Sequence, residues 1–340
     1  MKATSKNYLG IDVSKQWFDV SLLVVINHVK QPMLTERFDN AAAGIKAFKA
    51  WLKSRGVSYA ENSLLVIENT GVYHRLIWSF CSRHNLQLHI GNAAHIKWSL
   101  GITRGKNDVI DSQRLCLYCC RQADELKLTP VLSPVFMKLK DLMSSCRRLV
   151  VQLHSTKNYL KEIQCTDDKA LLAMLDKAHK AAIEGIKKSI LQIEAMIEQI
   201  IQQNKAIYTN YLLIKSVPGI GHLTAVYIIC CTNNFASKIS GKQLSSYAGV
   251  VPFGNTSGTS IKGKNKVHKM ANKELKKLLH LCALTAIKYY PEFKQYFERK
   301  KAEGKNGMLV LNAIRNKLIL RVVAVVNKQQ PYVDNTQVAA

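Results

Sequence analysis

The chain has 340 residues, and 47% of them are hydrophobic, so it can bury a sizeable core and form two or more domains. Its 49 Lys and Arg residues outnumber its 23 Asp and Glu residues, and the net charge of +26 favours a polyanionic partner such as nucleic acid. A ribosomal or membrane-surface protein could also be this basic, but ribosomal proteins are usually shorter and less apolar. The longest apolar run, residues 20–26 with Ser21 inside it, is far too short to cross a membrane.

The N-terminal sequence MKATSKNYLGIDVSK contains no long apolar segment and no cleavage site, so we expect no secretory signal. The nine cysteines are odd in number and irregularly spaced, which fits a reducing cytoplasm. Cys116 and Cys119 form a C-x-x-C motif, but the sequence has no second pair with zinc-site spacing. The surrounding pattern is helical and apolar, so we interpret both thiols as small buried hydrophobic groups.

Residues 1–130 alternate between strand-like and helix-like segments. Apolar runs bounded by turn residues predict strands at 8–14, 17–25, 33–39, 63–69 and 86–92. Between them, amphipathic patterns predict a helix at 41–56, closed by Gly56, and another through 78–85. This alternation indicates an α/β domain.

In residues 131–205 the apolar residues change to a spacing of three and four. The first set comprises Leu139, Leu142, Cys146, Leu149, Leu153, Leu160 and Ile163, with Thr156 in the missing place. The second set comprises Ile186, Ile190, Ile193, Ile197 and Ile200. We expect two long helices that form an antiparallel hairpin or a coiled coil between subunits, although the core of a helical bundle would show the same pattern.

Residues 206–330 begin with apolar helical segments joined by a tight turn at Pro218, Gly219 and Gly221. A helix-hairpin-helix places such a turn against a phosphate, so Gly219 and Gly221 are candidate nucleic-acid contacts. A plain turn between helices is an equal alternative. Residues 331–340 are predicted to be a disordered tail.

A Gly/Ser/Thr/Lys segment, which we expect to be a flexible loop, follows and leads into a strongly helical region. Between Lys262 and Arg321 there are sixteen Lys or Arg residues and four Glu residues. This density could be a solvated face, but its position beside the loop favours phosphate contact. The candidate residues are Lys262, Lys264, Lys266 and Lys269.

Four carboxylates are candidates for a metal site. Asp12 lies inside a short apolar strand, where a charge is costly unless it is paired or bound to a cation, and Glu68 ends another strand. Asp108 and Asp111 are three residues apart, so both would lie on one face of a helix. Two strands and one helix carrying such acids are what an RNase-H-like metal site requires, and their oxygens suit Mg²⁺ or Mn²⁺.

Each of these acids also has a simpler interpretation. Asp108 could cap its helix, Asp111 could pair with Arg114, and Glu68 could close the turn at residues 69–71. Asp12 is the hardest to explain in this way. Arg104 and Lys106 lie in the same basic stretch as the two helical acids, where DNA phosphates would pass.

Several motifs resemble those of the DEDD transposases of bacterial insertion sequences. In the first half they are GIDVSK (10–15), IENTGVYH (67–74) and KNDVIDSQRL (106–115). In the second half they are SVPGIGHLTA (216–225), LSSYAGVVP (244–252), TSGTSIKGKNK (256–266) and NKELKKLL (272–279). The resemblance covers almost the whole chain and preserves the order of the motifs. It implies an N-terminal domain similar to the Holliday-junction resolvase RuvC, with an RNase-H-like fold, and a mostly helical C-terminal transposase domain.

The resemblance also implies a division of roles. Asp12, Glu68, Asp108 and Asp111 would bind divalent metal, and Ser257 would attack DNA to form a phosphoserine–DNA intermediate. Without the resemblance, nothing selects Ser257 over Ser260.

Family members assemble as oligomers in which the RuvC-like domain of one subunit meets the serine loop of another, so we expect a dimer or tetramer. Some use a structured RNA to choose DNA, and we expect one here. We also expect a bacterial, cytoplasmic and nucleoid-associated protein. The chain departs from the family pattern at Asn92-Ala93, where Asn-Pro is common, and at Lys106-Asn107-Asp108, where Lys-Thr-Asp is common.

Three functions therefore fit the sequence. The first is an insertion-sequence transposase that cuts and rejoins DNA. The second is a site-specific invertase of the same family, such as those that flip pilin genes. The third is a nucleic-acid-binding protein that has lost catalysis, although the presence of all four acids and the serine argues against it.

Overall fold

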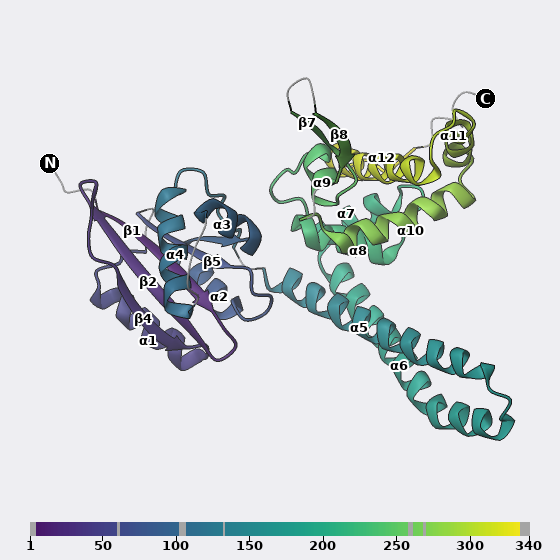
Figure 1. Ribbon diagram of the computed structural model, residues 1–340, viewed down its shortest axis with the longest axis horizontal. Helices are drawn as coiled ribbons and strands as arrows, with labels where there is room; N and C mark the ends of the chain where they lie inside the picture. Colours follow the sequence, from purple (N-terminus) through teal and green to yellow (C-terminus); the bar gives the residue numbers. More distant parts are fainter. Residues whose placement is uncertain are drawn as a thin grey trace. The chain divides into compact units, whose positions relative to one another are not determined.

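The computed structural model describes residues 5–59, 62–101, 107–131, 133–257, 261–267 and 270–333. The chain folds as two compact units, residues 1–133 and 134–340 (Figure 1). The finer division into segments 1–130, 131–205, 206–330 and 331–340 stays a prediction. In the described part, no helix is both long enough and apolar enough to span a bilayer.

The first unit is built on a mixed β-sheet. Its strands are β1 (Ser5–Val13), β2 (Trp17–Ile26), β3 (Val29–Lys30), β4 (Leu34–Asp39), β5 (Ser63–Glu68) and β6 (Gln87–Gly91). The main path through the sheet is β3-β2-β1-β5-β6, and β4 also pairs with β2. β2 runs antiparallel to β1 and β4, whereas β5 is parallel to both β1 and β6. The predicted strands of this half are confirmed.

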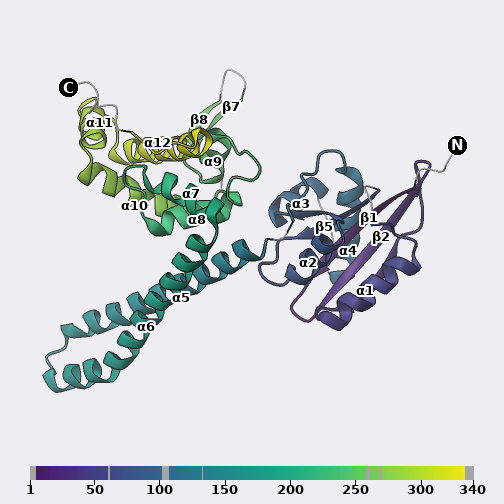
Figure 2. The ribbon, with the colours of Figure 1, turned by 180° about the vertical axis from the view of Figure 1, so that it is seen from behind.

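Helices cover both faces of this sheet. They are α1 (Ala42–Ser54), α2 (Arg75–Arg83), α3 (Ala93–Leu100) and α4 (Asp108–Arg121). Leu9 and Ile11 of β1 pack in one core with residues of α1 and α2, whereas Tyr8 packs in a second core with residues of α4. Figure 1 shows α4 in front of the strands, and the reverse view in Figure 2 shows α1 in front. Because side chains alternate along a strand, Gly10 and Asp12 belong to the α4 face.

The α4 helix lies unusually close to β1 at Gly10. A Cβ atom on Gly10 would be 2.0 Å from the backbone nitrogen of Cys116 and 2.3 Å from the carbonyl oxygen of Ser112. The Ser112 hydroxyl is 2.8 Å from that of Ser21, the residue paired with Gly10 on β2. Only glycine permits this approach, and it fixes the first turns of α4 over the C-terminal end of β1.

Cys116 and Cys119 are fully buried between α4 and the sheet. Their thiols lie 3.1 Å from the carbonyl oxygen of Tyr8 and 3.3 Å from that of Leu64, respectively. Burial raises the pKa of Cys116 to about 12 and also raises that of Cys119. Their interpretation as small hydrophobic groups is confirmed.

The second unit begins with two long helices, α5 (Pro134–Glu162) and α6 (Lys169–Gln203), which pack side by side (Figures 1 and 2). The Asp168 side chain caps α6 by accepting from the backbone N–H of Leu171, at 2.9 Å. Leu139, Ile197 and Ile201 are completely buried in the core of the C-terminal helices, whereas Val151 and Met174 are exposed. The coiled coil between subunits stays a prediction.

In the described part of the second unit, six further helices enclose its core. They are α7 (Lys205–Lys215), α8 (His222–Thr232), α9 (Gly241–Tyr247), α10 (Lys273–Tyr289), α11 (Pro291–Ala302) and α12 (Gly307–Lys328). Ile229 of α8, Leu279 of α10 and Leu318 of α12 are each buried in it. At the C-terminal end of the described part, Tyr332 packs against this core and its N–H donates to the Ser216 hydroxyl at 2.8 Å.

The prediction of a flexible loop at residues 256–266 is wrong for the described part of that segment. The strands β7 (Phe253–Ser257) and β8 (Ile261–Lys266) form an antiparallel hairpin, in which Ser257 pairs with Ile261. The base of the hairpin is held by a hydrogen bond from the N–H of Asn272 to the carbonyl of Tyr247, at 2.7 Å. Helices α9 and α10 therefore bring the two ends together, which local composition could not indicate.

We expect Gly10→Ala to destabilise the protein by about 2–3 kcal/mol, because the added methyl group would press on the backbone of α4. Gly185→Ala is a matched control: Gly185 is exposed within α6, and a Cβ atom placed there would meet no atom within 4 Å beyond its chain neighbours and the backbone of its own helix. That change should stabilise the protein by about 0.5–1 kcal/mol. Urea unfolding measures both. Equal stability of Gly10→Ala and the parent chain would show that α4 does not depend on this approach.

Candidate active site

Asp12 is the centre of a group of acidic side chains. Burial raises its pKa from 3.8 to about 6, with further contributions from the negative charges of Asp108, Asp111, Glu68 and Asp19. The other three acids predicted from the sequence are therefore each close enough to act electrostatically on Asp12. They come from β1, from the end of β5 and from the first turn of α4.

The sheet and α4 explain why these acids converge. Ile11 of β1 pairs with Ile67 of the parallel strand β5, so Asp12 and Glu68 follow at the same edge of the sheet. Asp108 and Asp111 lie in the first turn of α4. Negative charge there interacts favourably with the N-terminal end of the helix dipole.

Asn107 provides the N-cap of α4, because its side chain accepts from the N–H of Ile110 at 2.7 Å. Asp108 is thus the first helical residue rather than the cap. The turn after β5 is closed by Asn69, whose side-chain oxygen accepts from the N–H of Gly71 at 3.4 Å. The cap of α4 is therefore provided by Asn107 and not by Asp108.

The two departures from the family pattern lie at helix starts. Asn107 caps α4, a position in which Thr is also favourable. Ala93 is the first residue of α3, where proline is commonly tolerated, and Asn92 caps that helix. Both substituted residues are therefore compatible with the helix starts of the family pattern. Asp108 and Asp111 keep their positions in the first turn of α4.

Asp108 is held by residues of β2 and β4. The Trp17 indole N–H donates to its Oδ2 atom at 3.0 Å, and the Arg37 guanidinium lies 3.4 Å from the same atom. Arg37 also binds Asp19 through two hydrogen bonds, at 3.0 and 2.9 Å, and lies over the Trp17 ring. Asp19, with only 1% of its surface exposed, is the cross-strand partner of Asp12.

The sequence does not indicate Asp19, Arg37 or Trp17 as residues of the site. The only sequence signal is an acid inside the apolar run at 17–25, the same signal that pointed to Asp12. Its alignment with Asp12 depends on the register of β1 with β2, which the sequence alone does not specify.

Asp111 forms the predicted alternative contact with Arg114, at 2.9 Å. This ion pair does not exclude a role at the site, because Asp111 also contributes to the raised pKa of Asp12. Among the described residues, no three His, Cys, Asp or Glu side chains are arranged so as to hold a metal ion. The donor set itself, oxygen atoms only with a surplus of negative charge, fits a hard divalent cation.

The remaining predicted residues belong to the second unit or lie outside the described part of the chain. Ser257 ends β7 in the second unit, and Lys262, Lys264 and Lys266 belong to β8, where the structure describes the backbone only. Arg104, Lys106, Ser260 and Lys269 lie outside the described residues. The four acids and Ser257 are thus in different units of the chain.

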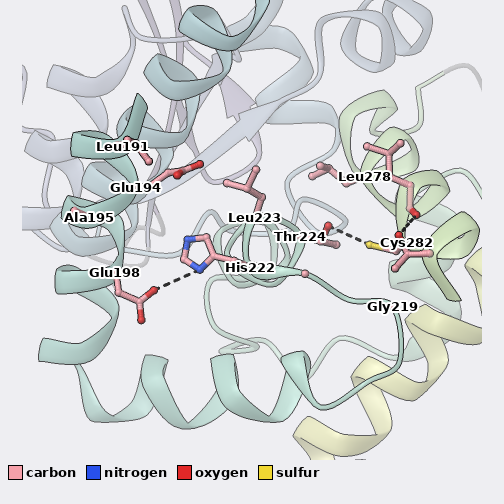
Figure 3. A pocket seen from close by; sticks show the side chains of 13 residues that line it. Leu191, Glu194, Ala195, Glu198, Gly219, His222, Leu223, Thr224, Leu278 and Cys282 are labelled. Atoms are coloured by element: carbon pink, nitrogen blue, oxygen red, sulfur yellow. Dashed lines mark hydrogen bonds and ion pairs between the residues drawn. The ribbon is translucent and has the colours of Figure 1, made fainter. Parts of the chain in front are cut away.

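The turn at Gly219 has a packing role. Its φ is +80°, and a Cβ atom there would lie 2.6 Å from the carbonyl oxygen of Cys282 on α10. A cavity of about 730 Å³ beside this turn is lined by leucines and by Glu194 and Glu198 of α6, as Figure 3 shows. The Glu198 carboxylate lies 3.5 Å from Nδ1 of His222, so acidic groups face the start of α8.

These surroundings favour the plain interhelical turn at Gly219. Negative side chains beside the start of α8 would oppose a phosphate placed there. A Cβ atom on Gly221 would meet open space, so packing does not explain that glycine. Its phosphate contact stays a prediction.

The sequence matches two family profiles. Residues 9–163 match a transposase family of the IS110 DEDD type, and residues 211–298 match the transposase IS116/IS110/IS902 family. The pilin gene-inverting proteins of Moraxella bovis and Moraxella lacunata are 27% and 28% identical to the chain, over 96% of it and 98% of each relative. An uncharacterized 43.6 kDa protein of insertion element IS110 from Streptomyces coelicolor is 32% identical, over 27% of this chain and 23% of its own.

An acid-lined sheet edge and these matches define an enzyme of DNA transposition and recombination. The chain belongs to the IS110 family of DEDD transposases. This membership implies an RNase-H-like fold for the N-terminal sheet and indicates the use of a divalent metal.

The raised pKa of Asp12 predicts how stability depends on pH. The folded chain holds the Asp12 proton more tightly than the unfolded chain, so folding stability falls as the pH rises from about 4 through about 6. Asp12→Asn removes this cost. In metal-free solution, after allowance for solvent screening, we expect it to be more stable than the parent by about 1–2 kcal/mol above neutral pH.

Thermal unfolding across this pH range measures the effect, and we expect a gain of roughly 3–5 °C that shrinks as the pH falls to about 5. Glu36→Gln is a matched control, because Glu36 is exposed on β4 and is not among the acids acting on Asp12. If the unfolding midpoints of Asp12→Asn and Glu36→Gln change equally with pH, the raised pKa of Asp12 is not the cause of the effect.

Proposed function

We propose that this protein is an insertion-sequence transposase that cuts and rejoins DNA with a four-carboxylate Mg²⁺ site and a serine nucleophile. Asp12, Glu68, Asp108 and Asp111 would hold Mg²⁺ or Mn²⁺, and Ser257 would form the phosphoserine–DNA intermediate. The observation that carries the proposal is the placement of Asp12 and Glu68 at one edge of the sheet, with Asp108 and Asp111 in the first turn of α4. The raised pKa of Asp12 supports it.

A bound divalent ion would supply positive charge that stabilises the negative charge of a phosphate under attack. Other side chains of the protein orient the acids that would bind this ion. Trp17 and Arg37 orient Asp108, and Arg114 orients Asp111 until a stronger cation competes for it. The surplus of negative charge on Asp12 and its neighbours favours cation binding over protonation at neutral pH.

The serine step conserves the energy of the DNA backbone. The Ser257 hydroxyl oxygen forms a bond to phosphorus, one phosphate ester bond to the neighbouring nucleotide breaks, and that nucleotide leaves as a hydroxyl that takes up a proton. Attack of a DNA hydroxyl on the phosphoserine reverses the exchange and rejoins a strand without an external energy source. A serine hydroxyl is weakly nucleophilic at its ordinary pKa, so a metal ion or a nearby base must activate it.

The proposal includes an assembly of two or four subunits. The acids and Ser257 belong to separate compact units, which is compatible with sites completed between subunits. It also includes a structured RNA that selects donor and target DNA. The net charge of +26 supports binding of both nucleic acids.

A site-specific DNA invertase is a second candidate, with the same chemistry. It is favoured by the two relatives that match nearly the full length of the chain, both named as pilin gene-inverting proteins. The DNA beside the gene separates the two functions: an invertase gene adjoins a segment found in both orientations, whereas a transposase gene lies between the ends of its own element.

We expect Ser257→Ala to abolish recombination and to remove any covalent protein–DNA adduct, because no other hydroxyl takes its place. Denaturing electrophoresis of labelled DNA after incubation with the protein detects the adduct. Ser260→Ala is the matched control and should keep both activities. Recombination by Ser257→Ala would eliminate the covalent mechanism and leave water or a DNA hydroxyl as the nucleophile.

A divalent cation should stabilise the first unit by binding to the acids. Titration with Mg²⁺ or Mn²⁺ is expected to raise the midpoint of thermal unfolding of the parent chain by about 2–4 °C, whereas Asp12→Asn should lose most of this shift. Glu36→Gln should respond like the parent. Equal shifts in all three proteins would place the cation elsewhere.

A further inference from the structure

Arg315 is a buried cation on the face of α12 that packs against α10. Only 5% of its surface is exposed. One of its terminal nitrogens, Nη2, donates to Nδ1 of His280, and Nη1 lies 3.5 Å from the side-chain oxygen of Asn312. Its Nε atom is buried and has no hydrogen-bond partner among the described residues. The two side chains that Arg315 contacts through its terminal nitrogens, His280 and Asn312, are therefore uncharged.

Two carboxylates of the neighbouring helices α10 and α11 are engaged by other cations. Glu274 of α10 pairs with Arg147 at 3.0 Å, and Glu292 of α11 pairs with Arg321. Two other cations of α12 are compensated: Arg321 has this carboxylate, and Lys317 lies 3.8 Å from the centre of the Tyr296 ring. In the described part of the chain, no carboxylate is paired with Arg315.

Two more basic side chains face the same place. Lys276 and His280 lie one turn apart on α10, and both are half-buried. Burial lowers the pKa of each, and the positive charge of Arg315 lowers it further. Like charges therefore gather here without an opposite charge, which is unfavourable for the folded chain by itself.

The donors of this cluster suit an anion with several oxygens. Because His280 accepts at Nδ1, its ring proton is on Nε2, so the neutral ring offers a donor. The Arg315 guanidinium has a planar fork of N–H groups, and Lys276 has a mobile ammonium. A phosphate group can accept from all three.

The cluster adjoins the base of the β7–β8 hairpin. Asn312, one turn before Arg315 and Asn316 on α12, donates from its side chain to the carbonyl of Val250 at 2.6 Å. Val250 leads directly into β7, which ends at Ser257. Figure 1 shows the hairpin rising beside α9 and α12.

We propose that Arg315, Lys276 and His280 form an anion site that binds a backbone phosphate of DNA at the base of the β7–β8 hairpin. The assignment of that phosphate to DNA rests on the proposed function, whereas the anion site itself does not. Bound there, the phosphate supplies the negative charge that Arg315 lacks, and the strand is held beside the segment that carries Ser257.

The first test is thermal unfolding of the full chain in inorganic phosphate at constant ionic strength. Phosphate should raise the unfolding midpoint of the parent by about 2–4 °C and leave that of Arg315→Met unchanged. Without phosphate, Arg315→Met should be as stable as the parent or more so, because methionine fills similar space without an uncompensated charge. A less stable variant that still gains from phosphate would make Arg315 a structural residue and overturn the proposal.

Matched variants separate this site from general charge effects. Arg299→Met removes an equal charge from an exposed position on α11 and should respond to phosphate like the parent. On α10, Lys276→Met should reduce the response, whereas Lys277→Met, at the adjacent exposed position, should not. This pair keeps the test decisive if Arg315→Met fails to fold. Equal responses of Lys276→Met and Lys277→Met would contradict the site.

The second test is binding to duplex DNA over a range of salt concentrations. Arg315→Met should bind at least about tenfold more weakly, with a salt dependence reduced by about one phosphate contact, and Arg299→Met should change little. A phosphate response without any change in DNA binding would overturn the assignment to DNA. If the phosphate response and the DNA-binding effect are both observed but the parent chain does not recombine DNA, the result would count against the proposed function alone.

Discussion

The close approach of α4 to β1 at Gly10 is the contact on which the candidate active site depends. A backbone-to-backbone approach of this kind leaves no room for a side chain, so the helix has one position along the strand. That position puts the first turn of α4, with Asp108 and Asp111, beside Asp12 and the end of β5. The buried thiols of Cys116 and Cys119 extend the same close packing toward the other end of the helix.

Each unit gathers side chains of one charge sign, acidic in the first unit and basic in the second. In the first unit, carboxylates converge on Asp12 and raise its pKa. In the second unit, Arg315 is buried with Lys276 and His280 beside it. Both arrangements are unfavourable in the isolated chain, and both become favourable when a group of opposite charge binds. Metal ions and DNA phosphates are the two ligands of phosphoryl transfer on DNA, so this distribution of charge agrees with the chemistry of the family.

The relatives also show why the fold does not select one biological role. Proteins named for pilin-gene inversion and proteins of insertion elements share sequence with this chain. Inversion and transposition both exchange phosphate ester bonds, and they differ in which DNA ends are brought together. The fold does not specify which DNA ends are joined.

The sequence by itself determined the α/β and helical halves, most of the strands and helices, and the candidate acids. Period-two and three–four patterns report which face is buried, and an acid within an apolar strand is conspicuous because its charge must be compensated. The tertiary structure decided which groups meet. The register of β1 and β2 aligned Asp19 with Asp12, Arg37 and Trp17 reached Asp108, and α9 and α10 closed a predicted loop into a hairpin. Arg315 looked like one more surface cation in the sequence, because burial and the absence of a carboxylate partner are properties of packing between distant segments.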